Sequence, residues 1–145
     1  MQALEVLKSK LIGSFISRFS VGDTWNLYID GYWLVAQEVI SGDEDYLNKF
    51  FENNYSHFKT TVDKGYISKC AIVAAAMRRD IVGVELDELY NLKIGFDNNF
   101  SLLFPTNVEI VDWQWCLNYN GTDPYTNCLV GCFWEGEIQV NEKQD

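Results

Sequence analysis

The chain has little of what most catalytic sites need. Its 145 residues contain one histidine, two prolines and four cysteines, and no two cysteines form a CxxC pair. The GxSxG elbow, the glycine-rich phosphate loop, HExxH and HxE with paired cysteines are all missing, which argues against the common hydrolase, kinase, metalloprotease and deaminase classes. His57 could act as a base beside Ser56 or activate Cys70, but no motif surrounds it. The sequence predicts a non-enzymatic protein without a cofactor.

Basic residues are almost missing from the second half. Residues 1–79 hold nine Lys or Arg and nine Asp or Glu, whereas residues 80–145 hold two basic and twelve acidic residues. The whole formal charge of −10 therefore lies in the second half. Nucleic-acid binding is disfavoured, because phosphate contacts need clustered Lys and Arg. A field of this sign attracts a basic protein.

Long apolar runs are also missing. Lys8 and Lys10 interrupt the apolar pattern of the first residues, and the longest uncharged stretch there is too short to span a membrane. No signal peptide is recognisable, so we expect a cytoplasmic protein without a membrane partner. The length suits one domain over residues 1–145 with a single hydrophobic core.

The cysteines do not form a recognisable disulfide or metal framework. Free thiols are predicted at Cys70, Cys116, Cys128 and Cys132. On a strand, Cys128 and Cys132 would share one face with Val130 and Trp134, where thiols act as small apolar fillers. A zinc site that joins the last three cysteines to His57 would have a spacing typical of no common structural site. We therefore predict no metal site.

Alternating apolar residues predict three β-hairpins. Asp30-Gly31 forms a two-residue turn between residues 24–29 and 32–39, and residues 97–99 connect two further strands. A third hairpin runs from residues 108–119 through a turn at 120–124 into residues 127–140. One side of its first strand is predicted to carry Val111, Trp113, Trp115 and Leu117, and the other side Asp112, Gln114 and Asn118.

Helices are predicted between the hairpins. Ser41 to Glu44 reads as a capping box, followed by a buried stripe of Tyr46, Leu47, Phe50 and Phe51. A second helix is predicted over residues 68–79, with Arg78 and Arg79 at the negative end of its dipole. A short amphipathic helix begins the chain.

These elements predict an α+β fold, with antiparallel sheets built from two or three β-hairpins and two or three helices packed on one side. Residues 11–13 (LIG) and 25–29 (WNLYI) recur in order as residues 81–83 (IVG) and 90–94 (YNLKI). The recurrence suggests an internal duplication with halves 1–60 and 68–145. Chance recurrence in a chain rich in aromatic residues is the alternative.

The size, acidity, aromatic content and lack of motifs resemble those of bacterial immunity proteins from contact-dependent and polymorphic toxin systems. Such proteins share a role rather than a fold, so the resemblance transfers no binding residues. It implies a tight, stoichiometric inhibitor, made in the cytoplasm of the toxin-producing cell, that covers the active site or an adjoining surface of a cognate toxin. A basic toxin domain of the nuclease type is the expected partner.

The expected binding surface combines acidic side chains for attraction with an aromatic anchor. The candidates are Asp43, Glu44, Asp45, Glu85, Asp87, Glu88, Asp112, Asp123, Glu135 and Glu137, with Tyr125 as the anchor. Each acid also fits a solvated surface, and residues 43–45 also fit a helix start. The alternatives are a carbohydrate-binding or glycan-active domain, a generic protein-interaction adaptor, and a homodimer paired through an exposed sheet edge.

Overall fold

The computed structural model describes residues 2–109 and 112–141. Its helices are α1 (Gln2–Leu11), α2 (Glu44–Asn54), α3 (Lys64–Ala76) and α4 (Pro124–Asn127), with a 3₁₀-helix η1 (Phe58–Thr60) between α2 and α3. Its strands are β1 (Ile16–Val21), β2 (Trp25–Ile29), β3 (Tyr32–Ala36), β4 (Ile81–Leu86), β5 (Leu92–Phe96), β6 (Ser101–Phe104), β7 (Trp115–Asn118), β8 (Cys128–Trp134) and β9 (Glu137–Val140). The α+β class predicted from the sequence is confirmed.

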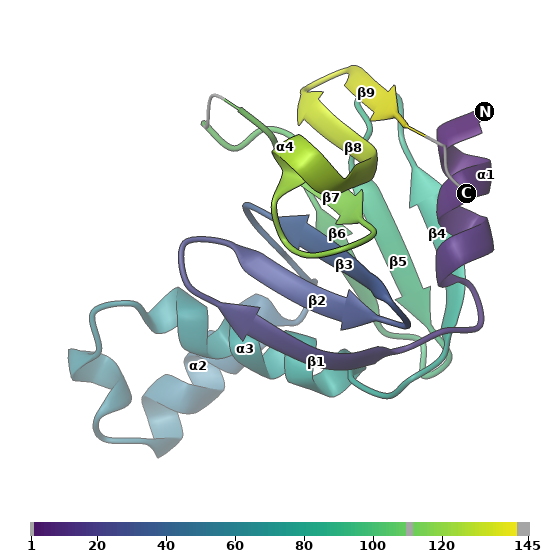
Figure 1. Ribbon diagram of the computed structural model, residues 1–145. Coiled ribbons are helices and arrows are strands. Elements are labelled where there is room, and N and C mark those ends of the chain that lie inside the picture. The colour runs from purple at the N-terminus through teal and green to yellow at the C-terminus, as the bar shows by residue number, and fades with distance from the viewer. Residues whose placement is uncertain (1, 110–111, 142–145) are drawn as a thin grey trace.

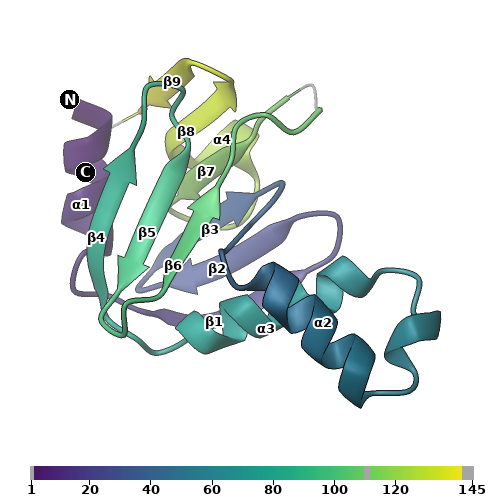
Figure 2. The same ribbon diagram turned by 180° about the vertical axis from the view of Figure 1, so that it is seen from behind.

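The strands form two antiparallel sheets, one of six strands in the order β1-β2-β3-β7-β8-β9 and one of three in the order β4-β5-β6 (Figures 1 and 2). The sheets form two layers, and apolar residues from both pack in one buried cluster together with α1 and α3. Trp115 and Phe104 are the largest fully buried side chains of this core. Area removed from water contributes about 25 cal/mol per Å², so this shared core joins the two sheets energetically.

Backbone hydrogen bonds tie both edges of the three-stranded sheet to the N-terminal half of the chain. At β4, Gly13 N–H donates to Ile81 O (2.9 Å) and Ile81 N–H donates to Ser14 O (2.8 Å). At β6, Ile40 and Leu103 exchange two hydrogen bonds of 2.9 Å. Neither edge of this sheet is therefore fully free to pair with another chain.

The predicted turns follow from residues that tolerate positive φ. Asp30 (φ 46°) and Gly31 (φ 91°) form the two-residue turn between β2 and β3, as predicted. Asn99 (φ 65°) closes the turn between β5 and β6, where Phe96 N–H donates to Phe100 O (2.8 Å). The amino-terminal helix is also present.

The two recurring segments occupy similar places in the two sheets. WNLYI forms β2 and the last three residues of YNLKI begin β5, which are the middle strands of two three-stranded antiparallel units. Their Leu and Ile residues point into the core in both copies. The other echo does not recur as structure, because residues 11–13 end α1 whereas residues 81–83 begin β4. The duplication stays a hypothesis.

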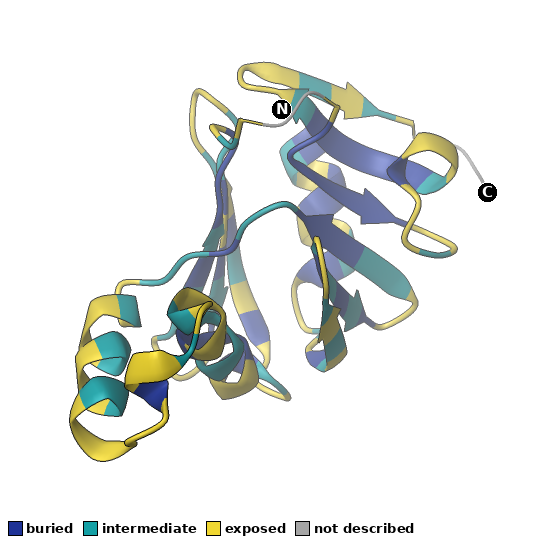
Figure 3. Ribbon diagram, turned by 90° about the vertical axis from the view of Figure 1, so that its left-hand side faces the viewer, coloured by how far each residue is buried: buried dark blue, intermediate teal, exposed yellow. Residues whose placement is uncertain are grey.

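The predicted buried stripe of α2 is wrong. No residue of α2 is buried, and Tyr46 and Phe50 are 70% and 41% exposed. Helices α2, η1 and α3 form a helical arm (residues 44–76) that projects from the sheets, so α2 packs mainly against α3 and its aromatic rings largely contact one another (Figure 3). Only half of the capping box forms as predicted: Ser41 N–H donates to Glu44 Oε2 (3.0 Å), but the Ser41 hydroxyl accepts from Asp43 N–H.

Helix α3 begins at Lys64, four residues before its predicted start, and it ends at Ala76 rather than at Arg79. Arg78 adopts a left-handed conformation (φ 64°) and its N–H donates to Ile16 O, which carries the chain away from the helix axis. The last turns of α3 place Ile72, Val73 and Ala76 in the core, and this contact anchors the helical arm.

The third predicted hairpin contains three shorter strands, β7, β8 and β9, in place of two long ones. Trp113 does not share a side with Trp115 and Leu117, because β7 begins only at Trp115 and Trp113 packs on the outer face with Val35 and Cys116. Val111 lies outside the described residues. Gln114 and Asn118 are buried. The second strand splits into β8 and β9 at Gly136 (φ 79°).

Cys128 also lies on the outer face, whereas Cys132 faces the core. The ladder between β7 and β8 shifts register at this point, since Leu117 pairs with Val130 but Asn118 pairs with Cys128. A shift by one residue reverses the side to which a strand residue points. The predicted common face of the two cysteines is therefore wrong.

Candidate binding site

Three segments from the second half of the chain meet at one end of the molecule. The Gly136 N–H of the β8–β9 turn donates to Leu89 O (3.4 Å) in the β4–β5 loop. The Thr106 hydroxyl, after β6, donates to the same carbonyl (3.0 Å). Trp115 Nε1 donates to Tyr90 O (2.9 Å), which fixes this loop against the start of β7. These bonds hold the β4–β5, β6–β7 and β8–β9 connections side by side.

Carboxylates gather on these connections and on the neighbouring α4. We call this region the acidic end; its carboxylates are Asp87, Glu88, Glu109, Asp112, Asp123, Glu135 and Glu137, all exposed. Residues 94–142 contain no Lys, Arg or His, so none of the segments at this end that follow β5 supplies a balancing charge. Unbalanced charge of one sign raises the local concentration of an oppositely charged partner.

Helix α4 covers the outer face of the six-stranded sheet beside this end (Figure 1). Asp123 is its N-cap, with Oδ1 accepting from Tyr125 N–H (2.9 Å), and Pro124 occupies the first turn. An acceptor at the N-cap followed by proline is a favoured helix start, because proline removes an N–H that would lack a partner. Asp123 and Pro124 thus fix the backbone position from which the Tyr125 side chain projects.

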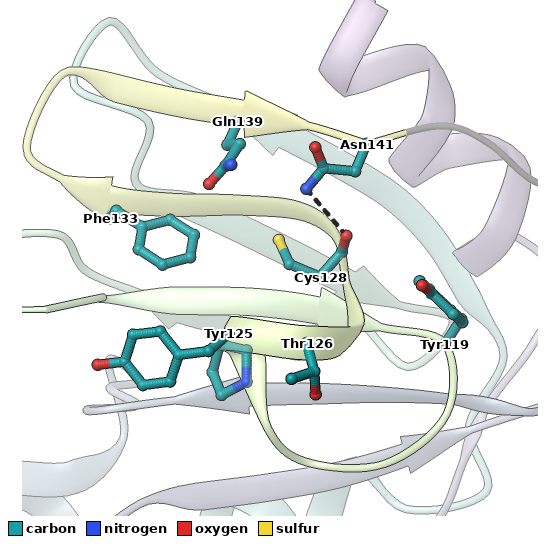
Figure 4. A pocket seen from close by; sticks show the side chains of 8 residues that line it. Tyr119, Tyr125, Thr126, Cys128, Phe133, Gln139 and Asn141 are labelled. Carbon is teal, nitrogen blue, oxygen red and sulfur yellow. Dashed lines mark hydrogen bonds between the residues drawn. The ribbon is translucent and has the colours of Figure 1, made fainter.

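A cavity of about 460 Å³ lies between α4 and the outer faces of β8 and β9. It is lined by Tyr119, Pro124, Tyr125, Thr126, Cys128, Phe133, Gln139 and Asn141, several of which are shown in Figure 4. The lining combines aromatic rings with uncharged hydroxyl and amide groups. Its size lies within the range of about 300–1,000 Å³ that is typical of small-ligand sites.

Two buried thiols lie at the base of this region. A Cβ atom on Gly131 would lie 2.9 Å from Cys128 Sγ and 3.0 Å from Cys116 Sγ, so both sulfur atoms fill the space that glycine leaves open. Cys116 Sγ donates to Asn118 Oδ1 (2.8 Å). Burial, with the hydrogen bond and charge of the neighbouring Cys128, raises the pKa of the Cys116 thiol far above its usual value. The Cys116 thiol is therefore uncharged at neutral pH.

Tyr125 lines the cavity, and its phenol interacts with Asp112. A hydrogen bond to Asp112 is the main cause that raises the pKa of the Tyr125 phenol to about 12, with smaller effects from desolvation and from the charges of Asp112 and Asp123. Tyr125 is 62% exposed, so it carries a neutral ring on the surface within an anionic field.

The structure brings together seven of the residues predicted from the sequence and separates four. Asp87, Glu88, Asp112, Asp123, Tyr125, Glu135 and Glu137 lie at or beside the acidic end. Glu44 and Asp45 lie at the start of α2 on the helical arm instead, and Asp43 is the N-cap residue before it. Glu85 lies in β4 directly opposite Lys93 of β5.

Two of the predicted carboxylates have structural partners. Glu44 Oε1 accepts from Lys69 Nζ (2.8 Å), which joins α2 to α3. Asp87 accepts from the N–H groups of Leu89 and Asn91 (2.9 Å each) and shapes the β4–β5 loop. Desolvation alone would raise the pKa of Asp87, but these bonds and one from the Asn91 side chain together lower it.

Several residues of the site were not predicted from the sequence. They are Glu109 at the acidic end and Tyr119, Thr126, Phe133, Gln139 and Asn141 in the cavity. Asp123-Pro124 is a recognisable helix start, and Glu135-Gly136 is a recognisable turn. These two signals predict a short helix after Asp123 and a hairpin turn at Gly136, whereas the packing of one against the other is visible only in the structure.

The residues considered for catalysis do not form a reactive cluster. His57 is exposed on the helical arm, beside a shallow apolar groove of about 310 Å³ that Phe51, Tyr55, Phe58 and Ile67 help to line. Burial raises the pKa of the Cys70 thiol, which disfavours the nucleophilic thiolate. In the part of the chain that the structure describes, no group of three or more His, Cys, Asp or Glu could hold a metal ion.

Among residues 2–109 and 112–141, no helix has both the length and the apolar character that crossing a bilayer requires. Comparison with family models, with curated proteins and with solved structures found no match for this chain.

Proposed function

We propose that this chain is a non-enzymatic immunity protein that binds and neutralises a basic toxin domain of the nuclease type through its acidic end. The observation that carries the proposal is the convergence of three connections whose carboxylates have no Lys, Arg or His among them. A nuclease presents cationic side chains that hold its nucleic-acid substrate. Carboxylates at the acidic end would compete for those side chains.

The electrostatics favour fast and selective association. Seven of the ten described Asp and Glu residues after Arg79 lie at the acidic end, and of the other three, Asp97 is paired with Arg79 (2.9 Å) and Glu85 lies opposite Lys93. A concentrated field steers an oppositely charged partner during diffusion and repels nucleic acid. Desolvated aromatic contacts then slow dissociation, and Tyr125 lies where it can supply one.

The test is to purify this chain and the basic domain encoded beside it separately, and to measure their association and dissociation rates from about 0.05 to 0.5 M NaCl. We expect association to slow with salt while dissociation changes less. The variant Glu109→Gln/Asp112→Asn/Asp123→Asn should slow association about tenfold at low salt.

The matched control is Asp43→Asn/Asp45→Asn, which removes exposed acids from the start of α2 and should leave the association rate nearly unchanged. Equal effects of the two variants would contradict the assignment of the acidic end. Failure to form a complex with the neighbouring gene product, together with a pull-down from the host that yields no basic protein, would overturn the immunity function.

The lining of the cavity favours a second candidate, which is carbohydrate binding. Tyr119, Tyr125 and Phe133 provide rings, and Gln139 and Asn141 provide amides. Such neutral groups suit stacking on sugars. A glycan array tests this second candidate directly. Sugar binding by neutral groups would also be insensitive to salt, unlike association with a basic partner.

A further inference from the structure

The cavity beside α4 has the chemical character of a receptor for a flat cation. Its rings are Tyr119 after β7, Tyr125 from α4 and Phe133 from β8 (Figure 4). None of its lining residues is cationic, and two carboxylates, Asp112 and Asp123, act on Tyr125 at its edge. Ring faces attract cations because the π-system carries negative charge on its face.

The amide groups of the lining offer further acceptors. Asn141 Nδ2 donates to Cys128 O (3.1 Å), so the amide nitrogen is engaged and the oxygen Oδ1 is left as an acceptor (Figure 4). Gln139 pairs with Gly131 on the adjacent strand and lines the same cavity. A guanidinium group carries five N–H donors in one plane and can use several acceptors at once.

The base of the cavity is apolar. Pro124 and Cys128 line the cavity here and are largely buried, so the base offers a small apolar surface to methylene groups. Long basic side chains bury their methylene stem against apolar atoms and keep the charged head near polar groups. The arrangement of apolar base and acidic edge matches that division.

We propose that this cavity receives the side chain of an arginine residue of the basic partner, with the guanidinium between the Tyr125 and Phe133 rings and the carboxylate of Asp112. The inference rests on the proposed function, since it names the group by which the toxin domain is held. Arginine suits the site better than lysine because its planar head stacks on rings and forms parallel hydrogen bonds to a carboxylate.

The first experiment uses small probes and needs no partner. N-acetyl-arginine amide, the corresponding lysine amide and the citrulline amide, which is a neutral isostere, are titrated into ¹⁵N-labelled protein. We expect the arginine probe to bind with a dissociation constant on the order of millimolar and to shift the amide signals of residues 125, 133, 139 and 141. The lysine probe should bind more weakly, and citrulline should not bind.

Two exposed positions provide variants that leave the core intact. Tyr125→Ala and Asp112→Asn should each weaken binding of the arginine probe at least about threefold. Tyr55→Ala on the helical arm removes a ring of similar exposure (56% against 62%) and is the control. Signal shifts confined to other regions, equal binding of citrulline, or displacement of the probe by a neutral sugar would overturn the arginine assignment.

The second experiment separates this inference from the proposed function. In the complex with the basic domain, Tyr125→Ala should raise the dissociation rate about tenfold or more while the association rate changes little. If Tyr125→Ala has no effect but the acidic-end variant still slows association, the cavity inference fails and the proposed function stands. If the arginine probe binds as described but no basic partner does, the proposed function fails and the cavity stands.

Discussion

Gly131 is the glycine with the least room for a side chain. A methyl group there would meet two sulfur atoms at 2.9 and 3.0 Å and the Trp115 carbonyl oxygen at 3.2 Å. The carbonyl belongs to a paired strand and cannot move freely. We expect Gly131→Ala to lower the free energy of unfolding by about 1–3 kcal/mol, as overpacking does in well-packed cores. Urea unfolding followed by tryptophan fluorescence measures the change.

Gly95 provides the matched control, because it also lies within a strand but an added Cβ would meet nothing within 4 Å. Gly95→Ala should change the free energy of unfolding by no more than about 1 kcal/mol, and a small gain is expected from the restricted unfolded chain. If Gly131→Ala lowers the free energy of unfolding no more than Gly95→Ala does, the thiols yield to the added methyl group and the prediction is wrong.

Tyr125 gives a residue-scale prediction about pH. Its phenol should titrate near pH 12 instead of 10, and Asp112→Asn should return the pKa toward 10. Because the folded-state pKa is raised, the stabilisation from this hydrogen bond is fully present below pH 10 and is lost as the pH rises toward 12. The ¹³Cζ shift of Tyr125 reports the titration. Asp97→Asn, at a site paired with Arg79, should leave it unchanged.

At the scale of elements, Lys69 connects the helical arm to the segment that follows β3. Its Nζ lies 2.7 Å from Val39 O, 2.8 Å from Glu44 Oε1 and 3.2 Å from Glu38 Oε1. The Lys69 side chain is 15% exposed, so solvent screens these interactions only partly. Removal of the cation would leave Val39 O and Glu44 Oε1 without this donor, whereas Glu38 Oε1 would keep the hydrogen bond from Val39 N–H.

Lys69→Met should therefore lower the free energy of unfolding by about 1–3 kcal/mol, less than for a fully buried pair. It should also speed proteolytic cleavage of the arm, because α2 has no buried residue to hold it. Lys59→Met, at an exposed position of η1, is the control. Equal protease sensitivity of the two variants would contradict the anchoring role.

Elements that are set by local chemistry were predictable from the sequence. The Asp30-Gly31 turn requires residues that tolerate positive φ, and the alternation in β2 and β5 marks the buried face directly. The exposed stripe of α2 was not predictable, because Tyr46 and Phe50 follow a helical period whether or not a partner surface covers them. The sheet face to which Cys128 points was also not predictable, because it depends on the register of β8 with β7.

At the scale of the whole molecule, the charge asymmetry could be read from the sequence but its geometry could not. The β4–β5 loop and the β8–β9 turn are distant in sequence, and they become neighbours through bonds such as Gly136 N–H to Leu89 O. Composition alone could not distinguish the acidic residues near α2 and in β4 from those at the acidic end. The acidic residues share a surface because the β4–β5, β6–β7 and β8–β9 connections lie side by side in the fold.

The pairing of β3 with β7 has a consequence for biosynthesis. Strand β3 leaves the ribosome long before β7, with the helical arm and the three-stranded sheet made in between. Until β7 emerges, the nascent chain presents an apolar strand edge over Tyr32 to Ala36 that lacks its second neighbour. A nascent chain that stalls before Trp115 is therefore expected to need a chaperone, because non-local strand pairing is slow and leaves such edges open.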